Sequence, residues 1–264
     1  MNIRPLILIM LWLTNTAFAK TDTSNIYAST EKSVYQIRVI NKQTSKKSSI
    51  GSGFTVNKAN ILATNYHVVS GYVNAPDKYD LEYLAKDGRK GKLEILDLDT
   101  THDLAVLRAK NELGPPLKIA PLPEKGAHLY SLGNPMDLGF SIVKGVNNGV
   151  MRNSEEKNIL VSGSLNPGMS GGPTLNEEGN VIGINVATSG NEISFLVPAE
   201  HLTHILERLE RRNYKPVYSI YDTISQQLVK NSQDKIQDLL DNDWSETTIS
   251  NFSVPSELSK TYKC

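Results

Sequence analysis

The chain of 264 residues contains almost no cysteine, no excess charge of either sign and no apolar run long enough to span a membrane. Its one cysteine is Cys264, so no disulfide can form within the chain, and stability must come from a hydrophobic core. Lys and Arg together number 28, and so do Asp and Glu. This balance gives no electrostatic reason to expect nucleic acid or an anionic membrane as a partner.

The first residues have the anatomy of a secretory signal peptide. Arg4 precedes an apolar run from Pro5 to Leu13, and a small-residue cleavage pattern ends at Ala19. A membrane-spanning helix needs about 20 apolar residues, so this run is too short to be an anchor. We therefore expect residues 1–19 to be a signal peptide, a periplasmic or secreted location, and no membrane anchor after cleavage.

Short runs typical of β-strands follow, separated by Gly, Pro and Asn turns. The run from Val34 to Ile40 alternates, with Tyr35, Ile37 and Val39 on one face. Further strands are expected at residues 50–56, 61–64, 92–96, 104–109, 127–133, 140–150, 158–163, 180–187 and 193–198. Many short strands of this kind indicate a barrel or a sandwich.

The pattern becomes helical after Pro198. Four apolar residues then follow at the spacing of one helical face, namely Leu202, Ile205, Leu206 and Leu209. A second helix is expected from about Val217 to Leu240, and the remaining tail has no clear period. We therefore expect a helical C-terminal extension over residues 200–264.

Three polar residues scattered along the chain could supply the parts of a nucleophilic site. A serine hydroxyl is a weak nucleophile, so it needs a base to take its proton and an acid to orient that base. His67 lies in TNYHVV, where we expect a strand to end in a short loop, and Asp103 lies in a polar turn that enters the next strand. Ser170 follows both, in NPGMSGGP.

The glycines around Ser170 also have a chemical use if Ser170 is a nucleophile. Acyl transfer develops negative charge on the substrate oxygen, and backbone N–H groups aimed at one point stabilise that charge. Gly168 and Gly171 lack Cβ atoms, so the loop can adopt the unusual dihedral angles that turn amides toward one place. Taken alone, the loop is equally compatible with a tight turn that carries an ordinary serine.

Six segments in register resemble the HtrA/DegP-type trypsin-like serine proteases: GSGF, TNYHVV, DLAVLRA, SLGNP, NPGMSGGP and GIN. The resemblance covers roughly Val34 to Pro198. It implies a mainly β fold, a chymotrypsin-like double β-barrel, with a protease domain over residues 28–199 and the catalytic cleft between the barrels.

The resemblance also implies a role for each candidate residue. His67 is the general base, Asp103 orients it, and Ser170 is the nucleophile. The amides of Gly168 and Ser170 form the oxyanion hole. The substrate is then a polypeptide, and the chemistry requires no cofactor and no metal.

The chain departs from the family pattern in two places. Met169 stands where the family usually has Asn, which alters substrate fit more than chemistry because the oxyanion donors are backbone groups. The residues after Pro198 are helical by pattern and too few for the PDZ domain that family members usually carry. Peptide-tail recognition by such a domain is therefore not expected.

The primary specificity pocket of trypsin-like barrels lies beside the residues before the nucleophile and the strand after it. In this chain these are Ser164 and the segment of Val186, Ala187 and Thr188, none of which is charged. A basic P1 side chain would lack a buried partner there. We therefore expect small or medium aliphatic P1 residues.

The remaining polar candidates have simpler interpretations. GMSGG also fits the nucleophile elbow of α/β-hydrolases, but Gly171, Gly172 and Pro173 would break the helix that this elbow requires. We expect His102 on the strand face opposite Asp103 and His128 in a strand. We expect His201 and His204 to lie on an amphipathic helix, and Asp97 and Asp99 to be solvated loop carboxylates.

The function expected from the sequence is that of an exported serine endopeptidase that works through an acyl-enzyme, with unfolded proteins as a candidate substrate class. The alternative is a binding or scaffold protein that keeps the protease fold without turnover.

Overall fold

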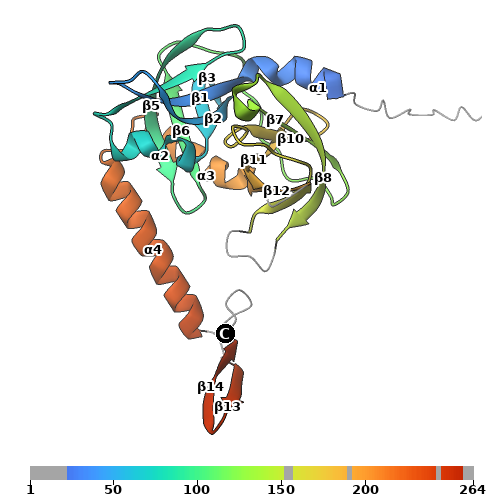
Figure 1. The fold of residues 1–264 in the computed structure, drawn as a ribbon, viewed down its shortest axis with the longest axis vertical. Helices are drawn as coiled ribbons and strands as arrows, with labels where there is room; N and C mark the ends of the chain where they lie inside the picture. The colour runs from blue at the N-terminus through green and yellow to red at the C-terminus, as the bar shows by residue number, and fades with distance from the viewer. Residues whose placement is uncertain (1–22, 152–156, 189–191, 242–244, 258–264) are drawn as a thin grey trace, which may run out of the picture.

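The computed structural model describes residues 23–151, 157–188, 192–241 and 245–257, and its main body is a pair of β-barrels (Figure 1). The expected signal peptide and Cys264 lie outside the described residues. None of the helices in these ranges combines the length and the apolar character that a membrane span requires.

The first barrel closes in the order β1-β2-β3-β6-β5-β4, with every pair antiparallel. Its strands are β1 (Val34–Asn41), β2 (Lys47–Val56), β3 (Lys58–Thr64), β4 (Tyr79–Leu84), β5 (Lys90–Asp99) and β6 (Leu104–Ala109). The alternating face of Tyr35, Ile37 and Val39 is buried inside this barrel, as its pattern predicts. Val34, on the other face of β1, is also buried, because that face contributes to the core shared by the two barrels.

The second barrel closes in the order β10-β11-β12-β9-β8-β7. Its strands are β7 (His128–Gly133), β8 (Ser141–Val150), β9 (Ile159–Ser162), β10 (Pro173–Leu175), β11 (Val181–Thr188) and β12 (Ile193–Pro198). Closure leaves neither sheet with an unpaired edge. The expected mainly β double barrel is therefore confirmed.

Helix α3 (Ala199–Arg211) packs against strands of both barrels. Its predicted apolar face is buried in the core cluster that the barrels share, through Leu202, Ile205, Leu206 and Leu209. Arg208 of the same helix donates from Nε to Asp97 Oδ2 over 2.9 Å. Arg212, just beyond the helix, donates from Nη2 to the same oxygen over 2.8 Å. Helix α3 thus joins the two barrels.

Asp97 and Asp99 correct one expectation, since neither is a solvated loop carboxylate. Asp97 lies within β5 and its side chain is fully buried on the two arginines of the α3 region. Asp99 ends β5 and is mostly buried. Burial of a charged side chain requires such partners, and those of Asp97 lie far away in the sequence.

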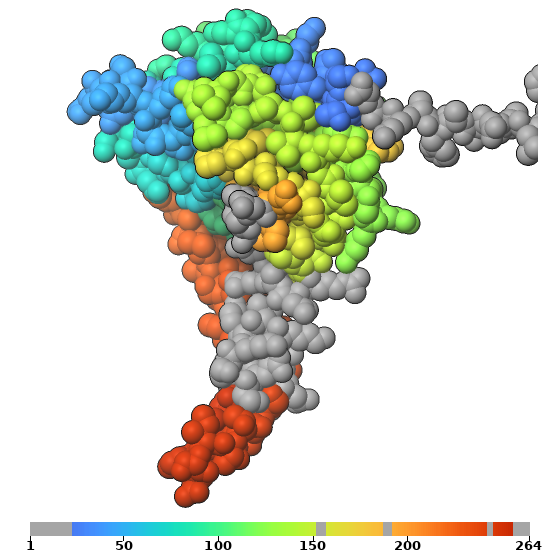
Figure 2. All heavy atoms as spheres, turned by 45° about the vertical axis from the view of Figure 1, so that its right-hand side comes forward, coloured from blue at the N-terminus to red at the C-terminus, as the bar shows by residue number. Residues whose placement is uncertain are grey.

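The remaining elements lie around the barrels. They are α1 (Thr23–Thr30), η1 (Glu31–Ser33), α2 (Tyr66–Asn74), η2 (Pro135–Asp137), α4 (Ile220–Asp241), β13 (Ser245–Ile249) and β14 (Phe252–Glu257). Helix α4 runs away from the barrels (Figure 1), and Figure 2 shows the β13–β14 hairpin standing apart from them. This hairpin, together with β4 and β10, was not anticipated from the sequence.

Candidate active site

His67 and Asp103 are brought together by the first barrel. The chain leaves β3 at Thr64 and enters α2 at Tyr66, so His67 lies in the first turn of a helix and not in the loop that the sequence suggested. Asp103 ends the turn before β6, as expected, with a left-handed φ of 54°. The two side chains form a hydrogen bond of 2.6 Å between His67 Nδ1 and Asp103 Oδ2.

The start of α2 also holds Asp103 through its backbone. His67 N–H donates to Asp103 Oδ1 over 2.8 Å, and Tyr66 N–H donates to the Asp103 carbonyl over 3.1 Å. The Asn65 side-chain amide donates to the same carbonyl over 3.0 Å. The first amides of a helix have no partner within the helix and favour negative charge, so this helix end fixes the carboxylate beside the imidazole.

The loop that carries Ser170 packs against the same part of the first barrel. A Cβ atom at Gly171 would stand 2.2 Å from Thr64 Oγ1 and 2.9 Å from Asn65 N. A Cβ atom at Gly51 would stand 2.5 Å from Val68 Cγ2 and 3.0 Å from the Ser170 carbonyl oxygen. Glycine at these two positions therefore lets the Ser170 loop approach the first turn of α2 closely.

The hydroxyl of Ser170 makes a hydrogen bond to the second barrel. Its Oγ donates to the Val186 carbonyl over 2.8 Å. The register between β11 and β12 shifts between Asn185 and Ala187, and this bulge leaves the Val186 carbonyl to Ser170. Among the described residues, Ser170 makes no hydrogen bond to His67, so the histidine–aspartate pair and the serine are held separately.

The amides expected to form an oxyanion hole have no acceptor among the described residues. Gly168 has a φ of +95°, a conformation that favours glycine. Its preceding peptide is fixed because Met136 N–H donates to the Pro167 carbonyl over 2.7 Å. The carbonyl and N–H of a trans peptide point in opposite directions, so Gly168 N–H points away from Met136. Ser170 N–H is likewise left without a partner within this part of the chain.

The residues expected to form the specificity pocket are placed unequally. Val186 is half-buried and lies directly beside Ser170. Ser164 is exposed at the beginning of the Ser170 loop. For Ala187 the structure describes the backbone, which pairs with Phe195, but not the side chain.

The other histidines form a separate group. His102 lies in the turn before β6 and not on the strand face expected for it, and its Nδ1 lies 2.8 Å from Asp99 Oδ2. Its ring stacks on His201 of α3 with centroids 3.7 Å apart. Burial, followed by the charge of His102, lowers the pKa of His201. Burial acts to raise the pKa of Asp99, but the hydrogen bonds and charge of His102, together with the charge of Arg208, lower it on balance.

A small cavity of about 210 Å³ lies between the candidate acid and the second barrel. Asp103 and His102 line one part of it, and Val186 and Val197 line another. The cavity therefore adjoins both Asp103 and Val186, whose carbonyl accepts the Ser170 hydroxyl.

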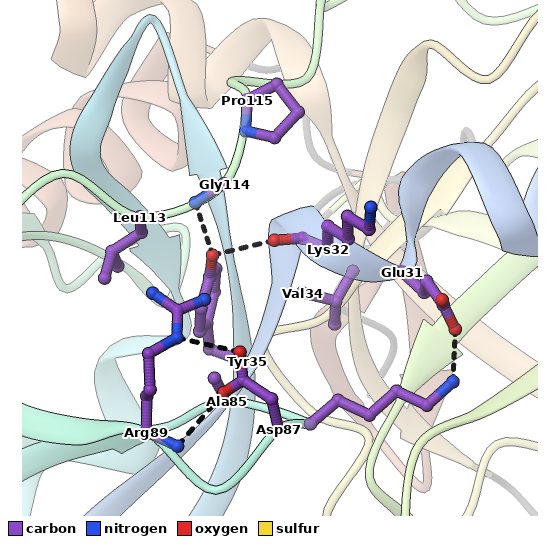
Figure 3. A pocket seen from close by; sticks show the side chains of 11 residues that line it. Glu31, Lys32, Val34, Tyr35, Ala85, Asp87, Arg89, Leu113, Gly114 and Pro115 are labelled. Atoms are coloured by element: carbon purple, nitrogen blue, oxygen red, sulfur yellow. Dashed lines mark hydrogen bonds and ion pairs between the residues drawn. The ribbon is translucent and has the colours of Figure 1, made fainter.

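A larger cavity, of about 660 Å³, lies elsewhere on the first barrel (Figure 3). Its side chains pair mostly with one another: Arg89 with Asp87, and Lys86 with Glu31. Burial raises the pKa of Tyr35, whose hydroxyl donates to a backbone carbonyl and accepts a backbone amide. None of the residues expected to act in catalysis lines this cavity.

Sequence reasoning missed two backbone features and one side chain of the site. The backbone features are the α2 amides that hold Asp103 and the bulge at Val186, neither of which has a local sequence signal. The side chain is Ser52 of GSGF, which donates to the Gly168 carbonyl. The signal for Ser52 is the pair of glycines that flank it, because glycine within a strand is typical of a close approach of backbones.

The sequence matches proteins of known class. The family model for the trypsin-like peptidase domain matches residues 51–184. Serine protease HTRA3 of Mus musculus is 30% identical over 179 aligned residues, and the match covers 63% of this chain and 39% of the relative. Mitochondrial serine protease HTRA2 of Drosophila pseudoobscura pseudoobscura is 31% identical over 177 residues, covering 63% of this chain and 40% of the relative. The chain therefore spans about two fifths of the length of these relatives.

Two solved structures share the fold. The serine endoprotease from Yersinia pestis superposes with a TM-score of 0.62 at 25% identity, covering 72% of this chain and 67% of that chain. Deg5 superposes with a TM-score of 0.60 at 25% identity, covering 70% of this chain and 92% of that chain. With the double barrel and a family match over residues 51–184, the chain belongs to the trypsin-like peptidase family.

Proposed function

We propose that the protein is a serine endopeptidase that hydrolyses peptide bonds through an acyl-enzyme. Ser170 is the nucleophile, His67 is the general base and Asp103 orients the base. The observation that carries the proposal is the His67–Asp103 hydrogen bond of 2.6 Å beside a glycine-rich loop that presents a serine. The family membership and the named relatives, which are serine proteases, support the same chemistry.

The geometry of the pair supports a separate role for each ring nitrogen of His67. Asp103 accepts from Nδ1–H of His67, which leaves Nε2 to take the proton of the serine hydroxyl. Ser170 Oγ then attacks the carbonyl carbon of the scissile peptide, and the bound proton passes from Nε2 to the departing amine. In the second half of the reaction, His67 takes a proton from water, and the water oxygen attacks the acyl carbon. The ester bond to Ser170 Oγ breaks, and the proton returns from Nε2 to Oγ.

The amides of Gly168 and Ser170 serve as oxyanion donors in this proposal. Both lack an acceptor among the described residues, and the fixed Pro167 carbonyl holds the orientation of the Gly168 N–H. Preorganised donors of this kind stabilise the tetrahedral intermediate without reorganising during the reaction.

Before the first step, Ser170 must leave the Val186 carbonyl. Rotation about the Cα–Cβ bond carries Oγ from one staggered position to another and requires no movement of the backbone. Release of the resting contact therefore needs a side-chain rotation and no rearrangement of the loop.

Location, domain limits and substrate class belong to the same proposal. Residues 1–19 are a signal peptide for export to the periplasm or beyond, residues 28–199 form the protease domain, and residues 200–264 form an extension. Ser164, Val186 and Ala187 line the primary pocket, whose uncharged character favours small or medium aliphatic P1 residues in unfolded polypeptides. A cleavage profile of a peptide library dominated by Arg or Lys at P1 would contradict this specificity.

One observation favours a second function, a binding protein with the protease fold and no turnover. Ser170 is hydrogen-bonded to Val186 and not to His67. If this contact persists with substrate bound, the hydroxyl never reaches its base, and the protein only holds polypeptides.

Labelling with a fluorophosphonate separates the two functions. The wild-type protein is expected to be labelled and to degrade unfolded casein, whereas Ser170→Ala is expected to do neither. His67→Ala, which keeps Ser170, is expected to lose most of the labelling and most of the casein degradation. A folded wild-type protein that is neither labelled nor active on casein would support the binding function instead.

A further inference from the structure

Ser52 lies where β2 passes beneath the Ser170 loop. It is fully buried and pairs with Gln36 of β1 in the sheet register. The glycines on both sides of it allow the neighbouring backbones to come close, as at Gly51 and the Ser170 carbonyl. Ser52 therefore belongs to the first barrel but touches a loop of the second.

The hydroxyl of Ser52 is both donor and acceptor. Its Oγ donates to the Gly168 carbonyl over 2.7 Å and accepts the Asn134 amide over 2.9 Å. The backbone N–H of Ser52 donates to the Ser170 carbonyl over 2.7 Å. A single residue thus holds the carbonyls of Gly168 and Ser170, the two residues whose amides are the proposed oxyanion donors.

These contacts fix the peptide that follows each donor. At Gly168, the preceding peptide is held by Met136 N–H and the following peptide by the Ser52 hydroxyl. Gly168 has a φ of +95° and no Cβ atom, so its own sterics leave the following peptide free to rotate. The Ser52 hydroxyl restrains this peptide at its carbonyl, and the Asn166 carbonyl, which accepts Met169 N–H over 3.0 Å, restrains it at its amide.

The site offers no obvious substitute for this hydroxyl. Ser52 is 0% exposed, and a Cβ atom at Gly133 would stand 2.9 Å from Ser52 Oγ, so the surroundings are closely packed. Without the hydroxyl, the buried Asn134 amide and the partly buried Gly168 carbonyl would both lose their partner. Unpaired buried polar groups are costly, so the loop would shift to satisfy them.

We propose that Ser52 is a positioning residue for the reaction: its hydroxyl and amide hold the peptides that follow Gly168 and Ser170, and so hold in place the loop backbone that carries the two oxyanion amides. Ser52 does not touch the substrate and acts through the loop. This inference rests on the proposed endopeptidase function and assigns the fixing of its oxyanion site to the first barrel.

Ser52→Ala tests the inference. Misplaced oxyanion donors weaken transition-state binding more than substrate binding, so we expect kcat to fall about 10- to 100-fold with KM changed by less than about threefold. The affinity for a peptide trifluoromethyl ketone, whose hemiketal oxygen occupies the oxyanion position, is expected to fall in parallel with kcat/KM. Ser52→Cys fills the space with a weak hydrogen-bonding group, so we expect it to lower kcat and ketone affinity as well. It replaces the alanine variant if that variant does not fold.

Thr55→Val is the matched control. Thr55 is also buried on β2, and its hydroxyl donates to the Pro115 carbonyl over 2.9 Å, outside the Ser170 loop. It is expected to lower the melting temperature and to leave kcat and ketone affinity near wild type. Unchanged kcat and ketone affinity in both Ser52 variants, or equal losses in Thr55→Val, would overturn the role of Ser52 and leave the endopeptidase function standing. A folded wild-type protein without activity or labelling would instead refute the function itself.

Discussion

At the scale of single residues, two histidine–aspartate pairs lie close together and differ mainly in their surroundings. Asp103 accepts both the backbone amide and the ring of His67, and Asp99 accepts the same two groups of His102. The His67 side chain is 49% exposed beside the Ser170 loop, whereas the His102 side chain is 35% exposed and its ring stacks on His201. Access to a substrate therefore favours His67 as the base, although the local contacts of the two pairs are alike.

The stacked pair of His102 and His201 gives the protein a pH-dependent stability. Burial first, and His102 and His204 next, lower the pKa of His201 below its ordinary value of 6.5, while Glu200 and Asp99 act in the opposite direction. As the pH falls below about 6.5, the unfolded chain takes up a proton that the folded chain still refuses. The free energy of unfolding therefore decreases toward acid pH.

His201→Phe is expected to reduce this loss of stability, because phenylalanine keeps a stacking ring and cannot be protonated. The measurement is the melting temperature at about pH 7.5 and about pH 5.5, compared with the wild type. His204 is exposed on the same helix and has the smallest of these effects on the pKa of His201, so His204→Gln serves as the control and is expected to keep most of the decline. An acid-side loss that is the same in His201→Phe as in the wild type would contradict the expectation.

At the scale of elements, two segments of the first barrel hold the candidate site. The start of α2 fixes Asp103 against His67, and β2 fixes the Ser170 loop through Ser52. Helix α3 performs a comparable task between the barrels, because it ties β5 to the second barrel. The position of the site between the barrels therefore depends on elements that link them.

Arg208→Ala tests the link made by α3. Asp97 is fully buried and would keep only Arg212 as an ion-pair partner. Because the Arg208 side chain is itself 36% exposed, we expect a loss of about 1–3 kcal/mol in the free energy of unfolding, less than for a fully buried pair. Urea denaturation measures it. Arg211→Ala, at an exposed position of the same helix, is expected to have almost no effect, and equal losses in both variants would refute the link.

At the scale of the whole molecule, the sequence predicts those parts that have a local period. Alternation identified β1 and the face that fills its barrel, and the 3.6-residue period identified the buried face of α3. The closure of two barrels followed from the family resemblance and not from periodicity. The three-residue β10 is too short to show a period, and it forms by pairing with β7 and β11.

The candidate site divides in the same way. The order of His67, Asp103 and Ser170 was readable, but helix α2 was not, because Val68, Val69 and Gly71 are weak helix formers. Packing of Val68, Val69 and Val73 into the core of the first barrel stabilises this helix. Asp97 was misread because its partners Arg208 and Arg212 lie 111 and 115 residues away. Contacts at that separation leave no local pattern.

The distal part of α4 and the β13–β14 hairpin make little described contact with the barrels. Ile220 and Ile224 pack against the first barrel, and the Gln227 side chain donates to the Leu98 carbonyl over 2.8 Å. Beyond this point, Leu228, Ile236 and Leu240 are largely exposed. These contacts of α4 with the first barrel lie between Ile220 and Gln227.

A chain shortened to end at residue 230 retains those contacts. We expect its melting temperature to lie within about 2 °C of the full chain, because little buried apolar area is removed. We also expect kcat/KM on a short peptide to be unchanged, since the removed residues do not contact His67, Asp103 or the Ser170 loop within the described structure. Thermal unfolding and peptide hydrolysis measure both. Higher kcat/KM in the shortened chain would show instead that the tail restrains the active site, and a lower melting temperature would show that the tail packs on the barrels.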